Sequence, residues 1–286
     1  MTTTTVDAPL PTRRHRPEST GATFPRVLNA EWIKFRTLRS TVWTLASTVV
    51  VMVGISFLIA WSTSTLDNPA DGGVVSANAA PMVVMAYYFG QFALAVLGVL
   101  VITGEYSTGM IRSTLAAVPR RLPALWAKAL VTAVVGAIVG AVAVTLSALV
   151  TMPFHDQLGL TLDLSDGETL RILGGAVLYL ATLALLALAI GALLRHSAAA
   201  LATILGLLLV IENVFSGIPH AFFQNISPFL PGTAGSRIML DDAGIAQAAE
   251  FATGPSLTPW QGYGVMLAWV VVLLAAAAVL LRRRDA

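Results

Sequence analysis

Hydrophobic residues gather in six long blocks along this chain of 286 residues, and polar segments separate the blocks. The blocks cover residues 42–61, 82–103, 124–150, 172–194, 198–217 and 263–281. Each is close to the roughly 20 residues with which an α-helix crosses the hydrocarbon core of a bilayer. Lipid offers no hydrogen-bond partner to an exposed backbone, so segments that span it at this length are α-helical. We therefore predict an all-α integral membrane protein with six transmembrane helices.

A shorter amphipathic segment, FPRVLNAEWIKFRTLRSTVW, leads into the first block. Its apolar residues fall on one helical face: Phe24, Leu28, Trp32, Phe35 and Leu38. This pattern predicts a helix that lies in the inner membrane interface. Glu31 interrupts the apolar face, although an ion pair with Lys34, three residues later, would lower the cost. The alternative is a basic flank that only fixes the topology of the first span.

The loop after the second block, GEYSTGMIRSTLAAVPRR, contains another short helical pattern. Gly104 and Glu105 end or bend the second span, and Pro119 stops the turn that follows. Between them, three residues spaced by four share one face: Met110, Thr114 and Val118. We expect a short helix parallel to the membrane, with Arg112 offering charge to a cytoplasmic partner. The alternative is an ordinary basic loop.

The charges along the chain predict its orientation, because Lys and Arg collect in short cytoplasmic loops. With the N-terminus inside, all of the 17 Lys and Arg residues except Arg171 and Arg237 fall on the cytoplasmic side. The outer segments then hold nine of the 15 acidic residues, namely Asp67, Asp71, Asp156, Asp163, Asp166, Glu168, Asp241, Asp242 and Glu250. We therefore expect both termini in the cytoplasm.

Composition supports a membrane protein and argues against other classes. Hydrophobic residues make up 56% and charged residues 11% of the chain, whereas soluble domains carry about 25% charged residues. The small net charge of +2 comes from basic residues beside apolar blocks, which favours a membrane surface over nucleic acid as partner. We interpret residues 1–23, rich in Thr, Pro and Arg, as a disordered cytoplasmic tail, and residues 24–286 as one six-span domain.

The connections between the blocks differ in length. The fourth and fifth blocks are joined by little more than Arg195, His196 and Ser197, which predicts a tight helical hairpin. The connection from 218 to 262 is much longer and is broken by proline and glycine. Its first part is too apolar for a solvated loop, so we expect short helices at the outer interface or dipping into it.

Glu212 is the acidic residue that falls within a predicted span. Carboxylates at membrane depth are costly and commonly face a cavity or a partner, so Glu212 is a candidate for substrate contact or proton relay. The alternative is that the fifth span ends here and Glu212 caps the irregular segment that follows.

Two weaker patterns have structural explanations as well. Gly136 and Gly140 allow close helix approach, more often for packing within the chain than for a dedicated dimer. The acidic residues between the third and fourth blocks lack a known metal-ligand spacing, which favours a solvated loop over a cation site.

Several motifs are absent from the sequence. It has no phosphate-binding G-x-x-x-x-G-K-[ST] loop, so we do not expect the chain to hydrolyse ATP itself. It has no H-E-x-x-H motif and no cysteine, which removes these metal sites, disulfides and cysteine nucleophiles. Ser216 near His220 lacks the glycine two residues earlier that an intramembrane serine protease motif needs. We expect no enzyme activity and no cofactor.

Two motifs, in their topological places, resemble bacterial ATP-binding-cassette (ABC) transporter permeases of the ABC-2 type. The first is Glu31-Trp32-x-Lys34-x-Arg36 before the first span, and the second is GEYSTGMIRSTL at residues 104–115. The resemblance implies the permease subunit of an exporter in the bacterial plasma membrane. It implies a dimer with a second copy or a paralogue, and cytoplasmic ATPase subunits on separate chains. The transported substrate does not follow from it.

The resemblance also implies roles for particular residues. The first inner loop would be a coupling helix that contacts the ATPase through Glu105, Tyr106, Gly109, Met110 and Arg112. The helix before the first span would be a connecting helix, with Glu31, Trp32, Lys34 and Arg36. The alternatives are a secondary, ion-coupled transporter, which would need paired charges in the membrane or inverted repeats, and a non-transporting membrane protein.

Overall fold

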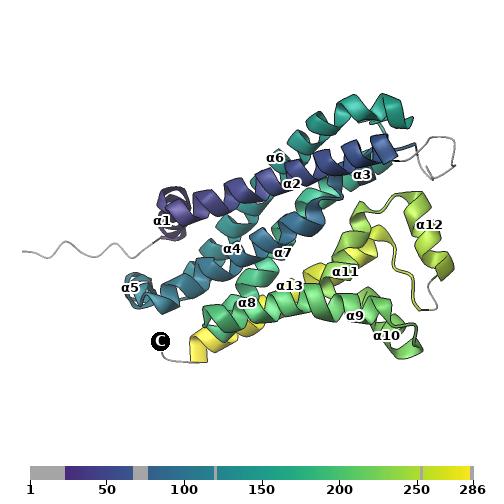
Figure 1. Cartoon of the computed structure of the whole chain (residues 1–286). Helices are drawn as coiled ribbons and strands as arrows, with labels where there is room; N and C mark the ends of the chain where they lie inside the picture. Colours follow the sequence, from purple (N-terminus) through teal and green to yellow (C-terminus); the bar gives the residue numbers. More distant parts are fainter. Residues whose placement is uncertain (1–22, 67–76, 119–120, 252–253, 284–286) are drawn as a thin grey trace, which may run out of the picture.

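The computed structural model describes residues 23–66, 77–118, 121–251 and 254–283 and is almost entirely helical, with no strand among them (Figure 1). The helices before the long final connection are α1 (Phe24–Thr37), α2 (Arg39–Leu66), α3 (Ala80–Val84), α4 (Tyr87–Ser107), α5 (Met110–Ala117), α6 (Leu122–Leu158), α7 (Gly167–Leu194) and α8 (Ser197–Leu205). A π-helical turn (Gly206–Ile211), α9 (Glu212–Gly217), α10 (Ala221–Ile226), a 3₁₀ turn (Ser227–Phe229), α11 (Pro231–Ser236), a second 3₁₀ turn (Arg237–Met239), α12 (Asp242–Phe251) and α13 (Pro259–Arg283) follow.

Six helical segments are long and apolar enough to cross a membrane, as the six blocks predict. They are Thr41–Thr65, Ala80–Ser107, Leu122–Leu158, Gly167–Leu194, Ser197–Gly217 and Pro259–Arg283. The structure differs from the predicted blocks in two details. The second span is interrupted between α3 and α4 at Met85 and Ala86, and α6 runs eight residues beyond 150, through Pro153, to the left-handed cap at Gly159. The predicted tail lies outside the described residues except for Thr23.

The span α7 forms the centre of the bundle, because it packs against α4, α6 and α13. Close contact with α4 depends on Gly98, where a Cβ atom would lie 2.3 Å from the carbonyl oxygen of Ala184. On the other side, the position of a Cβ at Gly136 is 3.1 Å from the Cα of Ala181. The glycine pair of α6 thus serves packing within the chain, as expected. Exposed apolar side chains remain on the outside of the bundle, including Trp43, Val50, Val271 and Val272.

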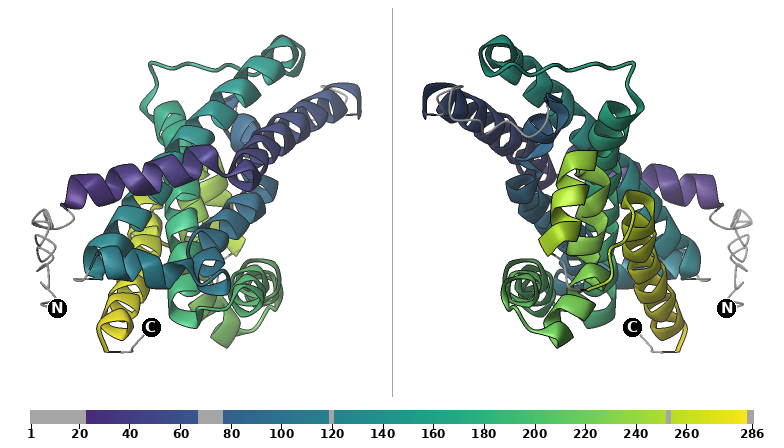
Figure 2. Two further views of the ribbon diagram at one scale, coloured as in Figure 1. Left: turned by 90° about the vertical axis from the view of Figure 1, so that its left-hand side faces the viewer. Right: turned by 90° about the vertical axis from the view of Figure 1, so that its right-hand side faces the viewer.

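The two ends of the bundle have different architecture. Figures 1 and 2 show α1 and α5 at one end, both running across the direction of the long spans. The link between α7 and α8 and the end of α13 lie at this same end. The short helices α10, α11 and α12 gather at the opposite end. The predicted hairpin of the fourth and fifth spans and the predicted short helices after residue 218 are both confirmed.

Candidate functional site

Four charged side chains meet where α1, α4 and α6 come together. Lys128 Nζ of α6 lies 2.7 Å from Glu31 Oε2 of α1 and 2.6 Å from Glu105 Oε1 of α4. Lys34 Nζ, on α1, lies 2.8 Å from each of the same two carboxylates. We call Glu31, Lys34, Glu105 and Lys128 the four-charge cluster. It contains two positive and two negative groups, so its formal charge cancels.

Helix geometry explains how α1 supplies two members of the cluster. Residues three and four apart share a helix face, and α1 buries Val27, Glu31 and Phe35 in this way. Phe24 and Leu38, at the ends of the predicted apolar face, are exposed, and the placement of this face in the membrane interface stays a prediction. Glu31, which interrupts that apolar pattern, lies at the centre of the buried face, and its predicted pair with Lys34 is confirmed.

Burial strengthens the hold of the cluster on the three helices that it joins. The side chains of Glu31 and Lys128 are 3% exposed and that of Glu105 is 8% exposed, whereas Lys34 keeps 29%. Charges this deep are costly unless they are paired and hydrogen-bonded. Burial lowers the pKa of Lys34, but hydrogen bonds to Glu105 and Glu31 outweigh it, so this pKa lies above its ordinary value. The stabilisation therefore holds at neutral pH and is lost when alkaline pH rises through that pKa.

The short helix α5 is joined to the cluster by a weaker contact. Gly109 precedes α5 in the left-handed conformation, with φ of 73°, a backbone that glycine adopts without steric cost. The hydroxyl of Thr114 then donates to Glu105 Oε2 at 3.4 Å. Met110 and Arg112 of α5 are exposed. The predicted short helix is therefore present, while Pro119, expected to stop it, lies outside the described residues.

Tyr106 connects the same region to the hairpin of α7 and α8. The guanidinium of Arg195 lies 5.4 Å from the centre of the Tyr106 ring, within the range of a cation–π contact. Arg195 itself adopts a left-handed conformation where α7 ends. The residues predicted for ATPase contact therefore point in two directions, since Glu105 faces the cluster and Met110 and Arg112 face outward.

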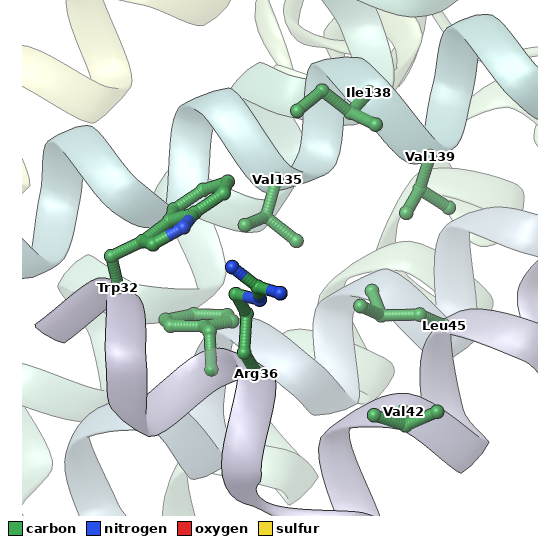
Figure 3. Close-up of a pocket in the computed structure, with 8 residues that line it drawn as sticks. Trp32, Arg36, Val42, Leu45, Val135, Ile138 and Val139 are labelled. Carbon is green, nitrogen blue, oxygen red and sulfur yellow. The ribbon is translucent and has the colours of Figure 1, made fainter.

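An apolar groove runs between α1, α2 and α6, with Trp32 at its edge. Figure 3 shows Trp32 and Arg36 reaching from α1 toward α6, with Val42 and Leu45 of α2 beside them. The groove has a volume of about 340 Å³. Arg36 is exposed, and its lining neighbours are almost all hydrophobic. This arrangement suits an amphiphile with apolar chains and an anionic head.

Glu212 lies at a second polar site, remote in sequence from the cluster. It is 9% exposed and begins α9, directly after the π-helical turn. The backbone N–H of Gly232 donates to its Oε1 at 2.7 Å, and the hydroxyl of Thr233 donates to Oε2 at 3.3 Å. Glu212 therefore holds α11 against α9, and it also borders a cavity of about 130 Å³. The alternative that the fifth span ends at Glu212 is wrong, because the helical segment runs on to Gly217, although Glu212 does bind the irregular segment that follows.

Sequence reasoning missed several members of both sites. Lys128 counted only as one more cytoplasmic charge, although, like Lys34, it contacts both carboxylates of the cluster. Tyr87, Gln91 and Tyr179 near Glu212 carried no motif. A polar residue within an apolar block, such as Lys128 or Gln91, is the signal that could have marked them, because such residues at membrane depth need partners. No group of three or more potential metal ligands occurs in the part of the chain that the structure describes.

Comparison with known proteins gives one family match. The model described as "ABC-2 family transporter protein" matches residues 27–213. The matched region contains all four residues of the cluster, the helix α5 and Glu212. A search of curated proteins finds no match.

Proposed function

The chain belongs to the ABC-2 transporter family and is a multi-pass membrane protein, the permease component of an ABC transporter, and from this we propose that it forms the pathway of an ATP-driven exporter. In this proposal both termini are cytoplasmic and the membrane is the bacterial plasma membrane. A second copy or a paralogue completes a dimer. ATP is hydrolysed on separate cytoplasmic ATPase subunits, and membrane lipids occupy the groove beside Trp32.

The observation that carries the ATPase coupling is the placement of α1 and α5 at one end of the bundle, joined through the cluster. Glu31 and Lys34 fix α1 to Glu105 and Lys128, near the ends of α4 and α6. Thr114 of α5 contacts the same Glu105. Since these charged contacts hold α1, α4 and α6 together, a force on α5 reaches two spanning helices at once. We propose that this is how ATPase motion enters the permease.

The outward side of α5 has features of a docking surface. Met110 is 47% exposed, and Arg112 is exposed beside it. Gly109 has no atom within 4 Å of where a Cβ would lie, so a partner can approach its backbone closely. Arg112 offers charge-assisted hydrogen bonds, each worth about 1.5–3 kcal/mol. Trp32 and Arg36 of α1 lie at the same end of the molecule and add to this surface.

Variants in α5 and in the residues just before it test this coupling. We expect Gly109→Leu, Arg112→Glu and Glu105→Ala to lower transport and transport-stimulated ATP hydrolysis. Both Gly109→Leu and Arg112→Glu should do so while the permease still inserts and dimerises, because they change exposed positions; Gly109→Leu also strains the left-handed backbone where α5 begins. Glu105→Ala also removes a member of the cluster, so its effect combines coupling with stability. The assay is ATP hydrolysis by the permease, reconstituted in lipid with the ATPase encoded beside it.

Arg282→Ala is the matched control, because Arg282 is an exposed arginine near the end of α13, outside the proposed contact. It should leave stimulated hydrolysis unchanged. Wild-type complex formation and hydrolysis in all three variants would show that this segment only fixes topology.

A second candidate function is ion-coupled secondary transport, which the buried carboxylate of Glu212 favours. The two functions separate in proteoliposomes. An ion-coupled carrier transports under an ion gradient without ATP, whereas the permease proposed above transports only with its ATPase and ATP. Gradient-driven transport by the chain alone would favour the second candidate.

A further inference from the structure

The cavity beside Glu212 is lined almost entirely by polar and aromatic side chains. It lies where α4, α7, α9 and α11 meet, and its lining residues are Tyr87, Tyr88, Gln91, Tyr179, Leu208, Glu212, Asn213, Ser216, Gly232, Thr233 and Ser236. We call this space the Glu212 cavity. It differs from the groove beside Trp32, which is mostly apolar and includes an arginine.

Charge decides which class of ligand the cavity suits. Glu212 is the charged residue among its lining residues, and none of them is Lys, Arg or His. Among the described residues, Glu212 forms no salt bridge, in contrast to Glu31 and Glu105. A buried carboxylate without a cation is costly. An anionic ligand is therefore disfavoured here, and a cationic ligand would supply the missing counter-charge.

Hydrogen bonding further restricts the class of ligand, because the cavity is rich in hydrogen-bond acceptors. A carboxylate has about four acceptor positions, and the donors of Gly232 and Thr233 leave at least one of them open. Several hydroxyl groups of the lining already donate to the protein: Tyr179 to Gln91 Oε1, Tyr88 to Asn213 Oδ1, and Ser236 to the carbonyl of Thr233. Their oxygen atoms keep lone pairs, one of which, on Tyr88, accepts from Asn213 Nδ2 at 3.2 Å. A ligand with several N–H donors and a positive charge fits such a lining, as an ammonium group does.

The size of the cavity favours an organic ammonium group over a bare ion. Its volume of about 130 Å³ is a little below the roughly 150 Å³ of an engineered cavity that binds benzene. An ammonium with one or a few carbon atoms fills this space, whereas a single metal ion would leave most of it to water. The tyrosine rings of the lining also suit a cation, since aromatic faces attract positive charge.

The cavity is reachable from the surface between α4 and α9. Tyr88, Asn213 and Ser216 belong to its lining and are exposed. Asn213 also donates to the carbonyls of Leu208 and Leu209 in the π-helical turn, a type of distortion that is frequent at functional sites. Binding at Glu212 therefore takes place beside an irregular segment of the fifth span.

We propose that the Glu212 cavity binds the protonated amine of an organic cation that this permease transports, with Glu212 as its counter-ion. The identity of the ligand as a transported substrate rests on the proposed function. The binding itself does not, so it can be measured without ATPase or ATP.

The test uses the full chain in nanodiscs of phosphatidylcholine, with dansylcadaverine as probe, a fluorescent primary alkylammonium. We expect saturable binding and at least tenfold weaker binding of the N-acetylated, uncharged probe. Glu212→Gln should weaken binding of the charged probe at least tenfold, because glutamine keeps the acceptor for Gly232 and removes the charge. Glu250→Gln, an exposed carboxylate on α12 outside the cavity, should leave the affinity unchanged. Propylammonium should displace the probe at concentrations where sodium does not.

A second pair of variants tests the site if Glu212→Gln fails to fold. Ser216→Lys places an ammonium on the chain at the exposed edge of the cavity and should abolish binding, whereas Ser216→Ala should retain it. Equal binding of the charged and acetylated probes, unchanged affinity in both Glu212→Gln and Ser216→Lys, or equal displacement by sodium would each overturn the proposal. Probe binding that persists in a chain without ATP-driven transport would instead refute the proposed function alone.

Discussion

The four-charge cluster and the Glu212 cavity both place carboxylates out of water, but they do so in opposite ways. In the cluster, Glu31 and Glu105 each contact two lysines within 2.8 Å. Glu212 is instead hydrogen-bonded by neutral groups of Gly232 and Thr233, and about 130 Å³ of open space lies beside it. The cluster is neutral and filled, whereas the cavity is open and its carboxyl group has no cationic partner among the described residues.

This difference indicates different uses of buried charge. A balanced ion cluster that joins α1, α4 and α6 fixes the relative positions of helices, and removing one member leaves another charge unpaired. A lone carboxylate at a cavity, already held by two donors, can keep its place with or without a further partner. If the uses differ, the two sites lie toward opposite sides of the membrane, and one is structural while the other is free to bind.

The largest expected effect is an all-or-none difference in chemical labelling. The chain has no cysteine, so single cysteines report their own location. With both termini in the cytoplasm, Asp163→Cys and Asp242→Cys should react with an impermeant maleimide on intact cells. Ser113→Cys on α5 and His196→Cys between α7 and α8 should react only after the cells are permeabilised. Labelling of Ser113→Cys in sealed cells would reverse the orientation and place the cluster on the outer side.

The next effect concerns stability, measured by equilibrium unfolding in mixed micelles. Lys128→Met leaves two buried carboxylates with one cation between them, and we expect it to lower the free energy of unfolding by about 3–5 kcal/mol. Lys34→Met leaves the same two carboxylates with one cation, but the side chain of Lys34 is 29% exposed, so water reaches the vacated position and the expected loss is smaller than for Lys128→Met. Arg282→Met, at an exposed position, is the control. Similar losses in both lysine variants would show that burial does not set the strength of the cluster.

The sequence predicted the spans and part of each site for identifiable physical reasons. The length of an apolar block is set by the thickness of the bilayer, so all six spans could be located without tertiary contacts. Glu31 and Lys34 could be paired because helix geometry brings residues three apart together. The contact between Glu105 and Lys128 could not be predicted, since it depends on how α4 and α6 rotate and slide against each other. The break before Tyr87 depends likewise on packing.

The Glu212 site shows the same limit. Its acidic residue was visible in the sequence because it interrupts an apolar block. Its partners on α11 follow a proline-broken segment whose path cannot be derived from periodicity, and the tyrosines of the lining come from α4 and α7. Sequence reasoning therefore left two alternatives for Glu212, a cap and a residue facing a cavity. In the structure the same side chain binds α11 and borders the cavity.

The smallest expected effect separates these two roles of Glu212. Glutamine retains an oxygen that can accept from the N–H of Gly232, and it removes a buried charge without a counter-ion. We therefore expect Glu212→Gln to change the free energy of unfolding by less than about 1 kcal/mol. Glu212→Leu has a similar size but leaves the N–H of Gly232 and the hydroxyl of Thr233 without this acceptor, and it should cost about 1–3 kcal/mol. Unfolding in mixed micelles without added amine compares the two variants.

If Glu212→Gln is as destabilising as Glu212→Leu, the negative charge itself holds α11 in place, and Glu212 is a structural residue like those of the cluster. A small loss for glutamine and a larger one for leucine means that hydrogen bonding holds the fold here, which leaves the charge available for a cation.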